Sequence, residues 1–147
     1  MLQFIEITNS AGEIVQPIWL ARAESVHRQL RTELSSDYVA QLSQVFENGA
    51  HMMVAVNHEQ VVGLAVWRVI INTFEGRRFY VDDLVTDESH RSQGVGQAML
   101  TNLDLLARQH HCDVLTLDSG TQRIRAHAFY FREGMHIPSF CFRKKLL

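Results

Sequence analysis

Cysteine, proline and long apolar runs are all scarce in this 147-residue sequence. Its two cysteines, Cys112 and Cys141, form no C-x-x-C pair and are too few for a disulfide-stabilised scaffold. No apolar run reaches the roughly 20 residues that a membrane-crossing helix needs. Residues 1–13 also lack the basic-then-apolar order of a secretion signal. We therefore expect a cytoplasmic protein with free thiols and no membrane partner.

The sequence also lacks a strong excess of charge of one sign. Fourteen basic and sixteen acidic residues give a net charge of −2, which provides no reason to expect a nucleic-acid partner. The 46% hydrophobic and 20% charged content is ordinary for a globular protein. Pro17 and Pro138 are the only prolines, and no linker or repeat divides the chain. Residues 1–147 are therefore expected to form a single domain.

Apolar periodicity predicts an alternation of strands and helices. Segments that alternate apolar and polar residues indicate strands, and apolar residues spaced three and four apart indicate helices. Strands are expected at 3–8, 51–56, 60–71, 78–86, 113–117 and 135–145, and helices at 13–31, 37–47, 94–110 and 122–133. The order is strand, two helices, three strands, helix, strand, helix, strand, which indicates a mixed α/β domain.

The most informative stretch is VDDLVTDESHRSQGVGQAML, residues 81–100. A strand that carries two carboxylates leads into a polar loop, a turn with two glycines, and an amphipathic helix. Gly94 and Gly96 allow the backbone to approach a ligand closely, and the helix start adds free N–H groups and a positive dipole end. Arg91 adds a permanent positive charge. This combination predicts a site for a pyrophosphate, although two glycines alone could simply form a strand-to-helix turn.

Two motifs relate the chain to a known family. Arg91-x-x-Gly94-x-Gly96 resembles the acyl-CoA signature of the GNAT N-acetyltransferases, and it is neither a dinucleotide G-x-G-x-x-G motif nor a P-loop. The segment AHAFYFREGM, residues 126–135, resembles a later motif of that family, with Met135 in place of the usual aromatic residue. The resemblance implies a mixed, mostly antiparallel central sheet of about six to seven strands flanked by about four helices.

The resemblance also implies acetyl-CoA as co-substrate. Its pantetheine arm would lie beside the strand that precedes the glycine loop, where a backbone N–H would serve the thioester oxygen. The pyrophosphate would bind at the loop and the helix start, and one histidine on the last helix could contact the arm. The residues implied are Leu84, Val85, Arg91, Ser92, Gln93, Gly94, Val95, Gly96, Gln97 and His127.

Tyr130 is the residue that the family motif implies as general acid. A tyrosine near the sulfur could protonate the departing thiolate. The alternative is that Tyr130, which lies between Phe129 and Phe131, is only a packing residue.

Asp82 and Asp83 are the candidates for general base. A primary amine has a pKa of about 10, so it must lose a proton before it attacks. Neighbouring residues of a regular strand face opposite sides, but relatives bulge at this strand, so the pattern does not decide between the two. We expect Asp83 ahead of Asp82, with a salt-bridged or solvated pair as the alternative.

Other catalytic arrangements have little support in the sequence. His110, His111 and Cys112 are consecutive and lack a partner pair, so no metal site is expected. Neither cysteine lies in a family motif, which argues against a covalent acetyl-cysteine intermediate. The resemblance implies an acceptor pocket built from the first two helices, the following loop and neighbouring strand ends, with candidates Trp19, Glu24, Glu33, Asp37, Tyr38, Trp67 and Phe74.

The sequence therefore predicts an N-acetyltransferase that moves the acetyl group of acetyl-CoA to a primary amine of a small molecule, directly within a ternary complex. Two alternatives remain open: a non-catalytic acyl-CoA-binding or regulatory module, and an acetyltransferase for protein N-termini or lysines. A homodimer is an assembly that the resemblance allows. The identity of the amine is left open.

Overall fold

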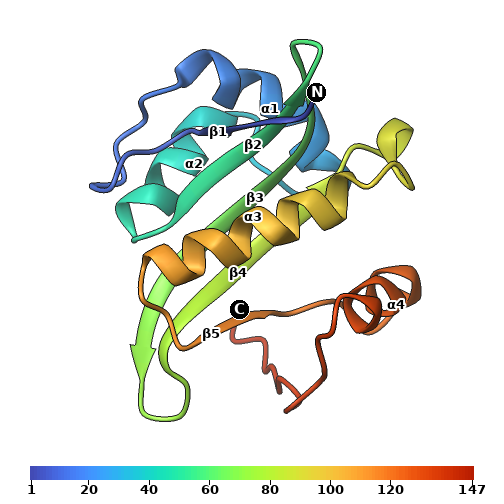
Figure 1. The fold of residues 1–147 in the computed structure, drawn as a ribbon. Coiled ribbons are helices and arrows are strands. Elements are labelled where there is room, and N and C mark those ends of the chain that lie inside the picture. Colours follow the sequence, from blue (N-terminus) through green and yellow to red (C-terminus); the bar gives the residue numbers. More distant parts are fainter.

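The computed structural model describes all 147 residues, which form one five-stranded sheet with helices on both faces (Figure 1). The elements are β1 (Gln3–Glu6), α1 (Pro17–Leu30), α2 (Tyr38–Glu47), β2 (His51–Asn57), β3 (Gln60–Asn72), β4 (Gly76–Thr86), the 3-10 helix η1 (Glu88–His90), α3 (Val95–Gln109), β5 (Val114–Leu117) and α4 (Ile124–Arg132). The strands lie in sequence order, antiparallel except for the parallel pair β4 and β5. The α/β class and the mostly antiparallel sheet are as predicted.

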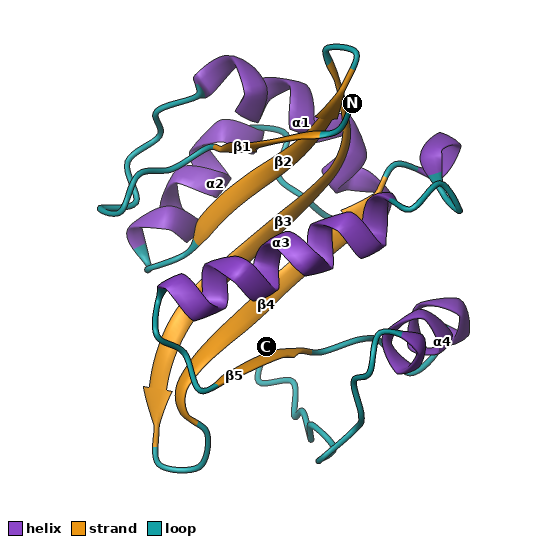
Figure 2. Cartoon of the chain, in the orientation of Figure 1, coloured by secondary structure: helices purple, strands orange, loops and turns teal.

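Two hydrophobic cores lie on opposite faces of the sheet. On one face, Leu20 and Val26 of α1 and Leu42 of α2 pack with alternate residues of β2 and β3. On the other face, Met99 and Leu103 of α3 pack on the remaining residues of the same strands. The sheet is thus buried on both sides, with α1 and α2 opposite α3 (Figures 1 and 2). This arrangement fixes the ends of α1 and α3 beside β4.

The first helix starts later than the sequence pattern indicated. Residues 13–16 fold back on the first strand instead, because Asn9 Oδ1 accepts hydrogen bonds from the N–H groups of Ala11 and Glu13. Ile14 then forms a β-bridge with Thr8. Such local side-chain bonds compete with helix formation. Helix α1 therefore begins at Pro17, a position where proline is well tolerated.

The predicted last strand, residues 135–145, is wrong, and the sheet has five strands rather than six or seven. Phe140 and Phe142 alternate as in a strand, yet they are 79% and 95% exposed. None of the N–H groups after Met135 donates a backbone hydrogen bond. The segment returns toward β5, where Phe140 and Cys141 border a small hollow with Tyr80, but it does not extend the ladder.

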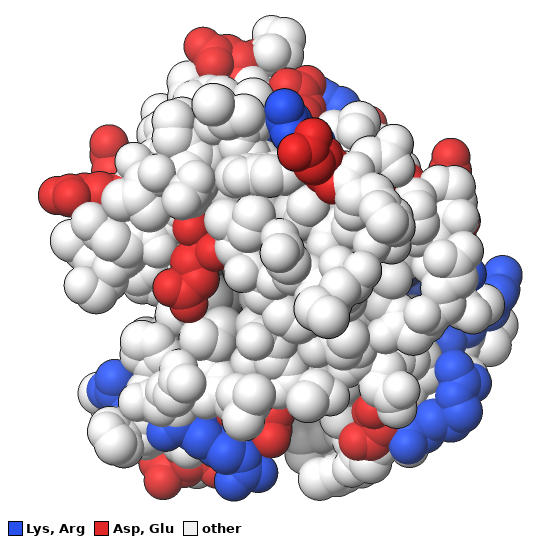
Figure 3. Space-filling view, turned by 45° about the horizontal axis from the view of Figure 1, so that its top comes forward, with Lys and Arg blue, Asp and Glu red and all other residues white.

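Charged side chains of both signs lie mainly near the edges of the face shown in Figure 3. The net charge of the chain is only −2. Charges close to a site therefore affect a ligand more than the field of the whole molecule does. None of the helices combines the length and the apolar character that spanning a membrane requires.

Candidate active site

Strands β4 and β5 part halfway along β4 and leave a gap. Their parallel pairing ends at Val81 opposite Leu117, whereas β4 continues to Thr86 (Figure 2). The Asp87 N–H donates to the carbonyl of Val62 on the β3 side, at 2.8 Å. Since backbone groups alternate along a strand, the N–H and C=O of Leu84 and Thr86 face the gap. An extended ligand could pair with this free edge.

A β-bulge lies where the strands part. On β3, Val66 is opposite Asp83 and Trp67 is opposite Val81, so Asp82 has no partner. A bulge bends the strand and redirects its side chains. As a result, Asp82 and Asp83 both line one cavity although they are neighbours in sequence.

The glycine loop has the geometry expected of an anion site. Gly94, just before α3, has φ of +82° and Ser92 has φ of +61°, so the backbone turns sharply into the helix. The N–H groups of Val95, Gly96 and Gln97 have no acceptor within the chain. Arg91, Ser92, Gln93 and Gly94 are exposed. Free N–H groups at a helix start, beside Arg91, suit an anion such as pyrophosphate.

The loop is held in place by the end of α1. Gln29 donates from Nε2 to Asp87 Oδ1 at 2.7 Å, and its Oε1 accepts from the Glu88 N–H at 2.9 Å. Burial alone would raise the pKa of Asp87, but hydrogen bonds from Gln29, Ser89 and His90 lower it to about 2. Asp87 is therefore an anionic anchor for η1 at neutral pH.

Helix α4 brings the second family motif to the first. A Cβ on Gly96 would lie 3.5 Å from the Phe129 ring, and Gln97 Nε2 donates to Glu133 Oε1 at 3.2 Å. Beside Phe129, the half-buried Tyr130 has no hydrogen-bond partner for its hydroxyl within the chain. Burial raises the pKa of Tyr130, and the positive charge of Arg123 offsets only part of that rise. The phenol therefore stays protonated and able to donate at neutral pH.

His127, on the same helix, has a contact of its own. Its Nε2 donates to the carbonyl of Gly120 at 2.8 Å, which ties α4 to the loop after β5. This contact gives His127 a role in holding the loop, and its contact with pantetheine stays a prediction.

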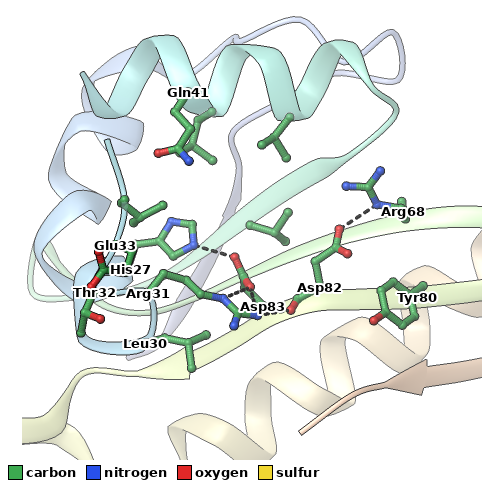
Figure 4. Close-up of a pocket in the computed structure, with 14 residues that line it drawn as sticks. His27, Leu30, Arg31, Thr32, Glu33, Gln41, Arg68, Tyr80, Asp82 and Asp83 are labelled. Atoms are coloured by element: carbon green, nitrogen blue, oxygen red, sulfur yellow. Dashed lines mark hydrogen bonds and ion pairs between the residues drawn. The ribbon is translucent and has the colours of Figure 1, made fainter. Parts of the chain in front are cut away.

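A cavity of about 630 Å³ opens on the α1 and α2 side of β4 (Figure 4). The end of α1 and the loop after it, α2, β3 and β4 all contribute to its wall. Its charged or titratable lining residues are His27, Arg31, Glu33, Arg68, Asp82 and Asp83, together with Tyr80. The carboxylates of β4 thus lie between this cavity and the gap beside β5.

Both carboxylate oxygens of Asp83 are engaged by residues at the end of α1, His27 within the helix and Arg31 just after it. His27 Nε2 lies 2.7 Å from Oδ2, and Arg31 donates from Nε to Oδ1 at 2.7 Å. Burial by itself raises the pKa of Asp83, but the hydrogen bonds and charges of His27 and Arg31 hold it below its usual range. His27 is 1% exposed, and its Nδ1 lies 2.9 Å from the Tyr38 hydroxyl. The two ring nitrogens of His27 are thus both engaged, one by Asp83 and the other by Tyr38.

The carboxylate of Asp82 has fewer hydrogen-bond partners than that of Asp83. Its Oδ2 accepts from Arg68 Nε at 2.7 Å, and its backbone carbonyl accepts from Arg31 Nη2 at 2.9 Å. Its Oδ1 has no partner within the chain, and its side chain is 26% exposed against 14% for Asp83. Asp82 therefore keeps one carboxylate oxygen free to meet a ligand in the cavity.

Sequence reasoning missed His27, Arg31 and Arg68. Of the acceptor-pocket candidates, Glu33 lines the cavity. Tyr38 does not line it, but its hydroxyl contacts the lining residue His27. Trp67 is stacked between His51 and Phe79 on the α3 side. The available signal was a histidine on the apolar face of α1, four residues before an arginine. No cluster of three or more His, Cys, Asp or Glu side chains could hold a metal ion.

Replacing His27 with leucine is expected to lower the free energy of unfolding by about 2–4 kcal/mol, because the buried Tyr38 hydroxyl and Asp83 each lose a partner. Urea unfolding measures the change. Exposed His136 is the matched control, and His136→Leu should stay within about 0.5 kcal/mol of wild type. Equal stability of the two variants would show that the His27 contacts contribute nothing.

Residues 14–135 match the model of the acetyltransferase (GNAT) family. The chain belongs to this family. The match includes the glycine loop, both aspartates and Tyr130. The enzyme class that the two motifs predicted, an acetyl-CoA-dependent N-acyltransferase, is confirmed at the level of the family.

Two N-acetyltransferases are similar to this chain in sequence. The Uncharacterized N-acetyltransferase YhdJ of Bacillus subtilis (strain 168) is 32% identical over 129 residues, which cover 84% of this chain and 89% of YhdJ. N-acetyltransferase 8 of Homo sapiens is 32% identical over 112 residues, which cover 76% of this chain and 48% of that protein. The chain thus matches about half the length of the human relative.

Solved structures share the GNAT fold. The aminoglycoside N-acetyltransferase AAC(6′)-Iy in complex with CoA superposes with a TM-score of 0.81, at 12% identity, and the alignment covers 99% of this chain and 96% of that one. Ribosomal-protein-alanine N-acetyltransferase from Brucella melitensis gives 0.80 at 12% identity, with 99% of each chain covered. At such identities the likeness concerns the fold alone.

Proposed function

We propose that this GNAT protein transfers the acetyl group of acetyl-CoA to a primary amine of a small molecule, directly within a ternary complex. The observation that carries the proposal is the free edge of β4, which has unpaired helix N–H groups at one end and two carboxylates on its cavity side. Donor and acceptor could therefore meet across a single strand. Single-domain organisation, a cytoplasmic location and a homodimer stay predictions.

The donor site uses backbone groups for most of its contacts. In this proposal the pyrophosphate accepts hydrogen bonds from the backbone N–H groups of residues 92–97, and Arg91 lies beside it. The pantetheine arm pairs with β4 at Leu84 and Thr86, whose backbone groups face the gap, and not at the expected Val85, whose backbone groups face β3. The gap-facing N–H of Leu84 then donates to the thioester oxygen and stabilises the negative charge that develops there.

The chemical step is an addition followed by an elimination. The neutral amine attacks the thioester carbon, and the tetrahedral intermediate collapses with cleavage of the C–S bond. Before the attack a carboxylate takes the proton of the bound ammonium, directly or through water. As the intermediate collapses, the nitrogen loses a second proton to solvent, and the CoA thiolate takes a proton from the Tyr130 hydroxyl, which solvent then reprotonates. The product is an amide and free CoA thiol.

The contacts favour Asp82 as the base, which reverses the order expected from the sequence. Both oxygens of Asp83 are engaged by His27 and Arg31, and its lowered pKa makes it a weaker base. Asp82 keeps Oδ1 free in the cavity. In this proposal Asp83 ties β4 to His27 and Arg31 and adds a negative charge to the cavity, and Asp82 receives the proton of the amine.

Asp82→Asn is expected to lower the acetylation rate about 10²-fold at pH 7, the lower end for a general base because water can also take the proton. The rate should recover about tenfold per pH unit toward pH 10, since the amine then loses its proton unaided. Asp83→Asn should show no such recovery. Initial rates from pH 6.5 to 10 measure both effects, and a wild-type pH profile for Asp82→Asn would exclude it as the base.

The function itself is tested by incubating the protein with acetyl-CoA and a panel of amines and measuring the free CoA thiol that acetyl transfer releases. Turnover of at least one small primary amine is expected. Acetyl-CoA binding without turnover across a broad panel that includes peptides would favour a non-catalytic acyl-CoA-binding module. Turnover of peptides alone would favour a protein acetyltransferase.

A further inference from the structure

The acceptor cavity is nearly neutral because its acids are already paired. Arg31 contacts Asp83, and Arg68 contacts Asp82 (Figure 4). Only Glu33, which is exposed, lacks an arginine partner among the acidic lining residues. Three carboxylates therefore face two guanidinium groups. A substrate with several positive charges would gain little binding energy in this cavity, because an arginine already neutralises each of the two carboxylates of β4.

Both arginines keep unused donors. Arg68 donates from Nε to Asp82 and from Nη1 to the Asn48 carbonyl at 3.1 Å, which leaves Nη2 without an acceptor in the chain. Arg31 uses Nε and Nη2, and its Nη1 is free. A guanidinium group presents five N–H donors in a planar fork that matches a carboxylate. The cavity thus offers cationic donors beyond those that hold its own acids.

Arg68 lies on the β3 side of Asp82, away from the gap. Asp82 is on β4, at the point where the strand parts from β5, and Arg68 is on the neighbouring strand β3. An amine next to Asp82 Oδ1 would lie close to the free edge of β4. A group at the other end of the same molecule would reach over β3 to Arg68.

We propose that the acceptor is a small primary amine that also carries a carboxylate, with the amine beside Asp82 and the carboxylate paired with Arg68. This inference rests on the proposed function and specifies its substrate class. Arg68 acts as a specificity-determining residue, and its own ion pair with Asp82 keeps the guanidinium group oriented toward the cavity.

The test compares amino acids with matched amines of equal chain length. β-Alanine, 4-aminobutanoate and 5-aminopentanoate are each compared with the corresponding alkylamine and diamine, with thiol release from acetyl-CoA as the readout. At least one amino acid should have a kcat/KM about 10- to 100-fold above both of its analogues, the effect of one charge-assisted pair. Higher kcat/KM for the diamines, or for the alkylamines, would overturn the inference.

Arg68→Gln should raise KM for the preferred amino acid about 10- to 100-fold and bring its kcat/KM close to that of the alkylamine. Arg108, exposed and paired with Asp104 on α3, is the matched control, and Arg108→Gln should keep the wild-type preference. An unchanged preference in Arg68→Gln would overturn the inference. Turnover confined to amines without a carboxylate contradicts this inference alone, whereas absence of turnover for every amine contradicts the proposed function as well.

Discussion

Gly94→Val is expected to weaken acetyl-CoA binding by about 10²–10⁴-fold. Gly94 has φ of +82°, a conformation that a β-branched residue rarely adopts, although nothing lies within 4 Å of the position of a Cβ. Valine would therefore change the backbone rather than collide with a neighbour, and the N–H groups at the start of α3 would turn away from the pyrophosphate. Loss of two hydrogen bonds to a charged group accounts for the expected change. Calorimetric titration with acetyl-CoA measures it.

Gly49→Val is the matched control. Gly49 follows α2 with φ of +95°, also with nothing within 4 Å of a Cβ, so the backbone strain should be similar. Both variants should lose comparable stability in thermal unfolding, and only Gly94→Val should lose affinity. Wild-type affinity in a folded Gly94→Val protein would show that acetyl-CoA does not bind at this loop.

Local pattern was enough to predict most of the fold. The apolar spacing of α3 and the glycines at its start predicted the helix and where it begins, because these depend on neighbouring residues alone. The exceptions have competing local or long-range causes. Asn9 diverted residues 13–16 from the helix, and the alternation of Phe140 and Phe142 indicated a strand, although both side chains are exposed and the segment does not pair with the edge strand β5.

The acceptor side could be predicted only in part. Asp82 and Asp83 were found because they belong to a motif of neighbouring residues. Their partners were not, since His27 and Arg31 are 56 and 52 residues away from Asp83 in sequence. A histidine on the apolar side of a helix looks the same whether it fills a core or holds a carboxylate. Only the packing of α1 against β4 distinguishes the two, and the same packing underlies our proposal that Asp82, rather than Asp83, is the base.

Tyr130→Phe is expected to slow the chemical step by about 10²–10⁴-fold, the usual contribution of a general acid. The substitution removes one hydroxyl and keeps the ring, so stability should barely change. Acetyl-CoA affinity should stay close to wild type, because the lost interaction belongs to the transition state. Single-turnover rates at saturating acetyl-CoA, with affinity measured in parallel, separate the effect on chemistry from an effect on binding.

The pH dependence adds a second readout for Tyr130. Burial raises the pKa of its hydroxyl above the usual value of about 10, so the wild-type enzyme should lose no activity through tyrosine ionisation below pH 10. Tyr130→Phe should therefore be slow by the same factor across this range, unlike Asp82→Asn, which recovers as pH rises. If Tyr130 only packs beside Phe129, the variant should turn over at the wild-type rate, and the thiolate must then leave without an acid from α4.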